Sequence, residues 1–350
     1  MDQNQLRIEQ YETVLYNANI NPLGLPDSVK NAILNNISSI GKYPEIYYRN
    51  LKTAVAEYVG SPIDTVITGN GSSDLIRLFI ALVAPKKALL LVPSASDYEV
   101  ALTSYNVDID YYQLDAEKEY TLDVDDLISH LDSSIDMIII GNPNNPTSRI
   151  TDATSISALA EATKDLGIFL VIDEMYIEFV DNYAGYTSVP LTKEFSNIAI
   201  IRSVSKFFAV PGLCFAYAIM NNTEMKQLID ITTTKNNIST LSAVAVTEML
   251  KDKKYIDDSA ELIHTERNLV YMAMSTNQNI SLTKPDANFM LMKILNPEIN
   301  SSVIADHCNQ RGIIIRKCDN IRGLGDKYIR FCFMKPKQND LCVNTILESV

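Results

Sequence analysis

The stretch AIIRSVSKFFAVPG, residues 199–212, places a lysine shortly after an apolar run that ends at Arg202. Ser203 follows the run directly, and Ser205 and Lys206 come next. The apolar residues are typical of a buried strand, so the lysine is expected just past a strand end. Most single lysines at such places are ordinary surface residues. A lysine amine can also form a Schiff base, and a partly desolvated position favours that chemistry.

Short apolar runs alternate with helical patterns from residue 62 to residue 222. Several runs are apolar at nearly every position, as expected for strands buried on both faces of a mainly parallel sheet. Two helices are expected between them, over residues 72–84, opened by a serine that can cap, and 152–167, closed by Gly167. The expected strands are TVIT (65–68), ALLLVP (88–93), VDIDYYQL (107–114), DMIIIGNP (136–143), GIFLVIDE (167–174), NIAIIRS (197–203) and CFAYAIM (214–220).

The pattern changes after about residue 242, where a long amphipathic helix is expected. Three strands, a helix between the first two and a terminal helix follow it, which is typical of a smaller α+β domain. We therefore predict an α/β fold with a mainly parallel seven-stranded sheet in a large domain, residues 45–241, and a small domain made of residues 1–44 and 242–350. The later elements are expected over 255–275 for the helix and over 289–295, 312–316 and 327–334 for the strands.

Composition excludes several classes of function. The net charge of -13 argues against nucleic acid and anionic membranes as partners. Five cysteines without a CxxC pair predict neither a disulfide framework nor a zinc site, and they favour a reducing, cytoplasmic location. No signal peptide or membrane-spanning run is visible. The three histidines are far apart, so no metal site is expected; they are His130, His264 and His307.

Ligands of open α/β sheets bind outside the carboxyl ends of the strands, so the loops there matter most. GNGSSDLIRLF begins at Gly69 and runs into a helix, whose first N–H groups can bind a phosphate. GNPNNPTS forms a rigid loop that presents the Asn145 amide. DEMYIEF places Asp173 at the end of a buried strand, with Tyr176 three residues on. Each feature alone also fits a plain connection, a helix cap or a structural ion pair.

Together, GNG (69–71), NPNNPT (142–147), DEMY (173–176) and SVSK (203–206) resemble, in this order, the fold type I pyridoxal-phosphate enzymes, the aspartate aminotransferase superfamily. The resemblance covers nearly the whole chain. It implies that pyridoxal 5'-phosphate is the cofactor and that Lys206 holds it as a Schiff base.

The same resemblance implies a role for each loop. Asp173 would pair with the ring nitrogen, Asn145 and Tyr176 would hydrogen-bond the ring 3-oxygen, and Tyr98 would stack on the ring. Tyr43 would reach the phosphate of the neighbouring subunit, which implies a homodimer with shared sites. The implied catalytic residues are Lys206, Asp173, Tyr176 and Asn145, and the other implied cofactor contacts are Gly71, Ser72, Ser73, Tyr98, Ser203, Ser205 and Tyr43.

One departure from the family concerns the cofactor phosphate. The family usually carries GLRxGY after the lysine, with its arginine on the phosphate, whereas residues 212–217 read GLCFAY. Cys214 cannot replace a bidentate cation. Either another cation serves or the phosphate is held more weakly.

Two segments, NANINPLGLP (17–26) and GIIIRKCDNIRGLGDKYIRFCF (312–333), look like the branch that holds histidinol-phosphate aminotransferases and, more closely, threonine-phosphate decarboxylases. The resemblance implies that Arg316 and Arg330 bind the substrate carboxylate and that Asn19 lies in the loop covering it. Arg322 fits equally a contact to the substrate phosphate and an ordinary arginine beside a glycine turn.

The expected activity is therefore decarboxylation of O-phospho-L-threonine to (R)-1-aminopropan-2-yl phosphate and carbon dioxide, in cobalamin biosynthesis, with O-phosphoserine as a conceivable variant substrate. The alternative is histidinol-phosphate aminotransferase or a related enzyme that uses 2-oxoglutarate. A third hypothesis is a relative without catalytic activity, but the presence of Lys206, Asp173 and Asn145 argues against it.

Overall fold

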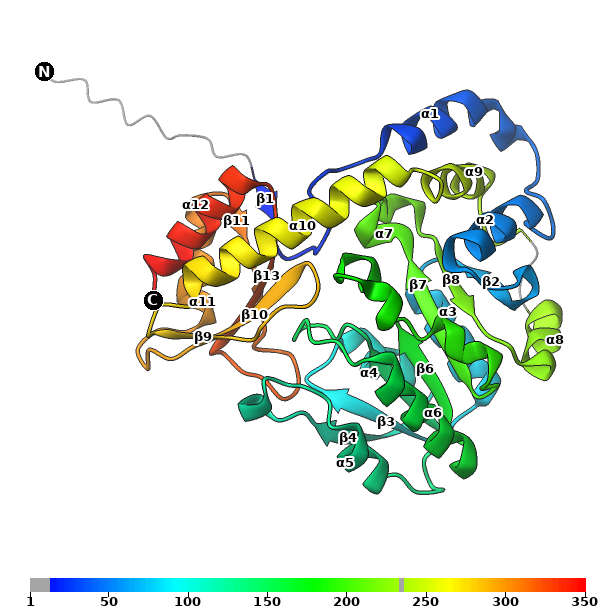
Figure 1. Ribbon diagram of the computed structural model, residues 1–350, viewed down its shortest axis with the longest axis horizontal. Coiled ribbons are helices and arrows are strands. Elements are labelled where there is room, and N and C mark those ends of the chain that lie inside the picture. Colours follow the sequence, from blue (N-terminus) through cyan, green and yellow to red (C-terminus); the bar gives the residue numbers. More distant parts are fainter. Residues whose placement is uncertain (1–12, 233–235) are drawn as a thin grey trace, which may run out of the picture.

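The computed structural model describes residues 13–232 and 236–350. Its centre is a sheet of seven strands in the order β2-β8-β7-β6-β5-β3-β4, in which β8 alone runs opposite to the other six strands (Figure 1). All seven expected strands occur, which confirms the predicted fold class. They are β2 (Val66–Gly69), β3 (Lys87–Val92), β4 (Asp108–Gln113), β5 (Met137–Gly141), β6 (Phe169–Asp173), β7 (Ile198–Ser203) and β8 (Ala216–Ile219).

Helices cover both faces of this sheet. Alternate residues of β6 pack in two separate clusters: Val171 lies with Leu75 of α3 and Leu102 of α4, whereas Leu170 lies with Leu159 of α6 and Val55 of α2. This explains the continuous apolar runs, because both sets of alternating side chains are buried. The helices are α1 (Asp27–Asn36), α2 (Arg49–Val59), α3 (Ser72–Val83), α4 (Ser96–Ser104), α5 (Val124–Ser129), α6 (Ala153–Leu166), α7 (Val204–Phe207), α8 (Thr223–Thr232), α9 (Thr240–Met249), α10 (Lys253–Met274), α11 (Ser301–Gln310) and α12 (Pro336–Leu347).

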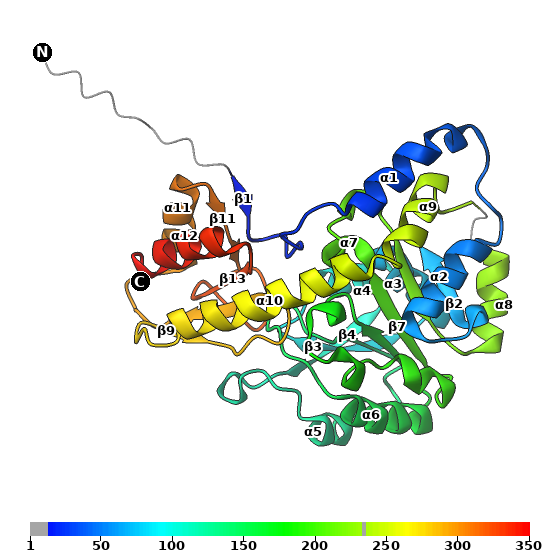
Figure 2. The same ribbon diagram turned by 45° about the horizontal axis from the view of Figure 1, so that its top comes forward.

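A second, four-stranded antiparallel sheet follows α10 in the chain, in the order β12-β13-β10-β9. A short parallel pair, β1 with β11, brings the chain near Val14 beside Ile313. Figures 1 and 2 show α10 running from this part of the molecule toward α9, beside which α1 lies. The strands are β1 (Val14–Leu15), β9 (Ile280–Leu282), β10 (Phe289–Ile294), β11 (Ile313–Ile314), β12 (Arg316–Lys317) and β13 (Tyr328–Cys332).

Two local expectations differ from the structure. The serine that was expected to cap α3 is its first helical residue, because Gly71 takes the cap position with a φ of 88°. The strand expected over 312–316 is divided into β11 and β12, each pairing with a different strand. The domain boundaries at residues 44/45 and 241/242 stay a prediction, and residues 1–12 and 233–235 of those ranges lie outside the described residues. Among the described helices, none is both long and apolar enough to cross a membrane.

Candidate active site

A cavity of about 410 Å³ lies at the carboxyl ends of β5, β6 and β7 and at the start of α3. This is the place where open α/β sheets bind ligands, and the volume is that of a small-ligand pocket. The cavity brings together most of the residues expected in the site, from the four loops and from elsewhere in the chain. Those that line it are Gly71, Ser72, Ser73, Tyr98, Asn145, Asp173, Tyr176, Ser203, Ser205, Lys206 and Arg330.

Asp173 is the last residue of β6, and it is 5% exposed. Its Oδ2 accepts a hydrogen bond from the Tyr98 hydroxyl at 2.9 Å, and its Oδ1 accepts one from the Met175 N–H at 3.0 Å. Burial raises the pKa of this carboxyl to about 6, although both hydrogen bonds act in the opposite direction. A carboxylate held in this way is suited to a cationic N–H partner.

Lys206 lies in α7, directly after β7. Its Nζ donates a hydrogen bond to the Ala18 carbonyl at 2.9 Å. Burial lowers the pKa of the amine, and the positive charge of Arg330 lowers it further. A lowered pKa increases the fraction of neutral, nucleophilic amine at neutral pH.

The start of α3 and the end of β7 supply donors for an anion. The first turn of α3 has no side-chain cap, so its N–H groups are available to a ligand. The Ser203 hydroxyl donates to the Ser205 hydroxyl at 3.1 Å, and both hydroxyls line the cavity. Cys214 lines it as well, with its backbone in the left-handed region at a φ of 48°.

Arg330 enters the cavity from β13, and it is 7% exposed. It donates from Nη1 to Asn145 Oδ1 at 2.5 Å and from Nη2 to the Asn17 carbonyl at 2.6 Å. Its guanidinium lies 5.5 Å from the centre of the Phe289 ring. The buried Nε has no hydrogen-bond partner, and no carboxylate pairs with Arg330 within the described ranges. Lys206 and Arg330 are the two cations among the residues lining the cavity.

Four expected residues do not line the cavity. Asn19 is buried behind it and donates to the Tyr176 hydroxyl at 3.3 Å. Arg316 donates to Asn320 Oδ1 at 2.7 Å, and Arg322 forms an ion pair with Glu99 at 2.7 Å. Tyr43 lies on the surface, 90% exposed. The roles assigned to all the site residues stay predictions.

Sequence reasoning missed several lining residues, notably Asn17, Asn70 and Asp97. Asn70 lies within the GNG motif and Asp97 directly precedes Tyr98, so both are sequence neighbours of residues that were expected in the site. Asn17 begins the segment 17–26, but the contact of its carbonyl with Arg330 involves the backbone and is not visible in a side-chain pattern.

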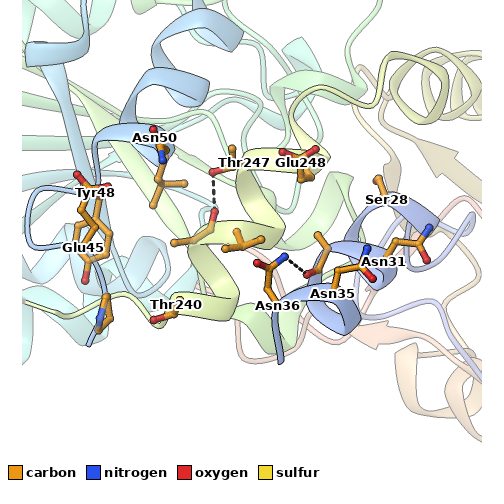
Figure 3. A pocket seen from close by; sticks show the side chains of 15 residues that line it. Ser28, Asn31, Asn35, Asn36, Glu45, Tyr48, Asn50, Thr240, Thr247 and Glu248 are labelled. Carbon is orange, nitrogen blue, oxygen red and sulfur yellow. Dashed lines mark hydrogen bonds between the residues drawn. The ribbon is translucent and has the colours of Figure 1, made fainter. Parts of the chain in front are cut away.

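A larger cavity, of about 670 Å³, lies between α1, α2 and α9 (Figure 3). Figure 3 shows asparagines of α1, among them Asn31 and Asn35, near Thr247 and Glu248 of α9. Its described lining contains no lysine, arginine, histidine or cysteine. It therefore lacks a cation for a phosphate and an amine for a Schiff base, and the smaller cavity is the better candidate.

Replacing Cys214 with arginine is expected to tighten binding of a cofactor phosphate by roughly tenfold or more, the effect of one charge-assisted hydrogen bond. The substitution adds little backbone strain, since Cys214 already has a positive φ. The cofactor dissociation constant, measured by absorbance titration, checks this. Cys214→Ser, which adds no charge, is the control; equal affinities of all three proteins would show that residue 214 does not face the phosphate.

Known proteins match the chain over most of its length. Residues 12–346 match the family model "Aminotransferase class I and II". A Caldanaerobacter subterraneus subsp. tengcongensis protein, provisionally named a threonine-phosphate decarboxylase, is 30% identical, over 95% of this chain and 89% of its own length. The threonine-phosphate decarboxylase of Salmonella typhimurium is 27% identical, over 93% of this chain and 88% of its own.

A solved structure is similar as well. The histidinol-phosphate aminotransferase of Clostridium acetobutylicum is 32% identical, with a TM-score of 0.89, over 96% of this chain and 98% of that one. The order of the loops, the fold and the family match agree, and pyridoxal 5'-phosphate is the cofactor. The chain belongs to the class I and II aminotransferase family of pyridoxal-phosphate-dependent enzymes.

Proposed function

We propose that this enzyme decarboxylates O-phospho-L-threonine to (R)-1-aminopropan-2-yl phosphate and carbon dioxide, in cobalamin biosynthesis in the cytoplasm. The observation that carries the proposal is Arg330, a buried guanidinium in the cavity with no carboxylate partner in the described chain. Burying a cation without an anion costs free energy, which a bound anion would recover. O-phospho-L-threonine carries such an anion as the carboxylate on its Cα. In the alternative reaction histidinol phosphate carries no carboxylate but 2-oxoglutarate does, so Arg330 supports a carboxylate-bearing substrate in either reaction. Similarity to two proteins named for threonine-phosphate decarboxylation favours the decarboxylation.

The residues of the cavity fit pyridoxal phosphate by their chemistry. Lys206 would hold the cofactor covalently, and Asp173 would face the ring nitrogen. The serine hydroxyls at the start of α3 and at the end of β7 would bind the phosphate. The uncapped N–H groups of α3 add donors there. When bound, the cofactor accepts the electron pair of a bond broken at the substrate Cα.

The protein side chains would orient the substrate and move its proton. Arg330, fixed by the Asn145 amide and the Asn17 carbonyl, would hold the carboxylate and so select which bond at Cα breaks. The Lys206 Nζ, with its lowered pKa, would give a proton to Cα after carbon dioxide leaves. Asp173 would keep a proton on the ring nitrogen, and the Tyr98 hydroxyl would keep that carboxylate in place.

The need for an amino acceptor tests the proposal. We expect O-phospho-L-threonine to be converted continuously to the amine in the absence of any oxo acid. The second candidate, histidinol-phosphate aminotransferase, is favoured by the 32% identity to a solved enzyme of that name. It predicts the opposite: no amine from O-phospho-L-threonine, and amino transfer from histidinol phosphate only when 2-oxoglutarate is present.

A homodimer is part of the proposal. The segment from α1 to α2 exposes apolar side chains, which a second copy would cover. Tyr43 lies within this segment, so a partner chain could present it to the cofactor phosphate. The exposed apolar residues of the segment are Leu34, Ile37, Ile40, Tyr43, Ile46 and Tyr47.

Replacing Ile40, 64% exposed, with aspartate is expected to shift the protein from dimer to monomer, because a charge would be buried in the interface. Light scattering after size exclusion measures the mass. Ile231→Asp is the matched control, because Ile231 of α8 is an isoleucine with 80% exposure outside the segment from α1 to α2, and the change should leave the dimer intact. A wild-type protein that is monomeric would remove this part of the proposal.

A further inference from the structure

A fully buried arginine lies between two glutamates on the face of the sheet opposite to Asp173. Arg202 has a side chain that is 2% exposed, and those of Glu174 and Glu178 are 0% and 4% exposed. The guanidinium contacts Glu174 Oε2 at 3.0 Å from Nε and at 2.9 Å from Nη2, and Glu178 Oε1 lies 3.8 Å from Nη1. Nothing in the proposed reaction uses these three groups.

The position of the pair in the sheet links it to the active site. Glu174 follows Asp173 at the end of β6, and Arg202 precedes Ser203 at the end of β7. Successive side chains of a strand point to opposite faces. Asp173 and Ser203 line the cavity, whereas Glu174 and Arg202 meet each other behind it. The ion pair therefore joins the two strand ends that carry residues of the site.

The surroundings hold the pair in one geometry. Thr187 Oγ1 accepts from Arg202 Nη2 at 2.7 Å and donates to Glu174 Oε2 at 2.9 Å. The Ser188 N–H donates to Glu174 Oε1 at 2.5 Å. Glu174 is thus bonded through both oxygens, and its own N–H donates to the Ile201 carbonyl at 2.8 Å.

The buried network around Arg202 is not expected to add much to the free energy of unfolding. A buried ion pair is often no more stabilising than a well-packed apolar pair of the same size. Here Glu178 Oε2 and the hydroxyl of Tyr58, which feels the charges of Glu178 and Arg202, are buried without hydrogen-bond partners. In some proteins such buried ionic groups serve to specify one geometry rather than to add stability.

We infer that the Arg202–Glu174 pair is a positioning device, which holds the ends of β6 and β7 so that Asp173 and Lys206 face the two ends of one cofactor. The inference rests on the proposed roles of Asp173 and Lys206. Those roles are tested separately, because the wild-type protein must first show the absorbance band of a lysine-bound cofactor. A wild-type protein without that band would refute the proposed roles of Asp173 and Lys206, and this outcome differs from a failure of the positioning role of the Arg202–Glu174 pair.

The experiment compares Glu174→Gln, Arg202→Lys and the apolar double variant Glu174→Leu/Arg202→Met. For each, the melting temperature of the apoprotein, the pyridoxal-phosphate dissociation constant and the pH midpoint of the absorbance band are measured. We expect the double variant to melt near the wild-type temperature. Its pyridoxal-phosphate dissociation constant should rise by roughly tenfold or more, and the pH midpoint of its absorbance band should differ from that of the wild type. Glu174→Gln and Arg202→Lys should weaken cofactor binding in the same direction.

Arg267→Met is the matched control. Arg267 is 4% exposed, pairs with Asp181 and donates to the Phe179 and Asp286 carbonyls. None of these partners belongs to β6 or β7, although Phe179 follows Glu178 in the chain. It should lower the melting temperature without changing the cofactor dissociation constant or the midpoint. The inference is overturned if Glu174→Gln and Arg202→Lys melt lower but bind the cofactor like the wild type, or if the control changes cofactor binding as much as they do.

Discussion

Lys206→Ala is expected to remove the covalent attachment of the cofactor and to lower kcat by about 10⁴-fold, the upper range for a residue that transfers a proton in the reaction. The size of the effect follows from two roles, because the same Nζ would bind the cofactor and protonate the substrate Cα. Absorbance of the loaded protein, and its mass after borohydride reduction, measure the attachment.

Lys52→Ala is the matched control for this experiment. Lys52, in α2, also has a pKa lowered by burial, but it does not line the cavity. Replacing Lys52 should change neither the absorbance band of the bound cofactor nor the mass that the cofactor adds after borohydride reduction. A Lys206→Ala protein that still carried a reducible cofactor would show that another lysine holds it.

Asp173→Asn is expected to lower kcat by roughly 10²- to 10³-fold and, at the same time, to stabilise the apoprotein at pH 8. Burial raises the pKa of Asp173 from 3.8 to about 6, so the folded apoprotein binds a proton that the unfolded chain releases. The resulting penalty is absent below pH 3.8, grows as the pH rises and is complete above pH 6, where it reaches about 3 kcal/mol. Asparagine has no such penalty.

Urea unfolding of the two apoproteins at several pH values measures the difference. The variant should be more stable than the wild type at pH 8, and the advantage should shrink as the pH falls toward 4. Asp152→Ala serves as a contrast, because Asp152 caps α6 and its pKa is lowered by the N–H groups it accepts from. That change should destabilise the protein at pH 8, by about 1 kcal/mol. An advantage of Asp173→Asn that did not depend on pH would contradict the buried-carboxylate account.

The sequence revealed those parts of the molecule that depend on local pattern. Strands buried on both faces are apolar at nearly every position, which marks six of the seven. The seventh, the edge strand β4, is largely exposed, and its aspartates and glutamine interrupt the apolar pattern. Asp173 and Lys206 could be placed at strand ends because their motifs follow directly from apolar runs. The cap of α3 was misjudged because Gly71 takes the cap position in a backbone conformation that favours glycine.

Contacts between segments that are distant in the sequence could not be predicted from local sequence patterns. Arg316 and Arg322 were grouped with Arg330 by one motif, yet neither lines the cavity. Arg316 is bonded to the nearby Asn320, and Arg322 pairs with Glu99, which is 223 residues away in the sequence. Likewise Glu174 and Arg202 are 28 residues apart and look like isolated charges. Only the parallel pairing of β6 with β7 brings them together.

The fate of the substrate carboxyl carbon tests the central claim most directly. O-phospho-L-threonine labelled with ¹³C at C1 is mixed with the cofactor-loaded enzyme, without an oxo acid, and followed by NMR. We predict that the label appears as carbon dioxide and bicarbonate over many turnovers, while the unlabelled carbons accumulate as the amine phosphate. Retention of the label in the amino acid, or in an oxo acid formed from it, would contradict the proposed decarboxylation.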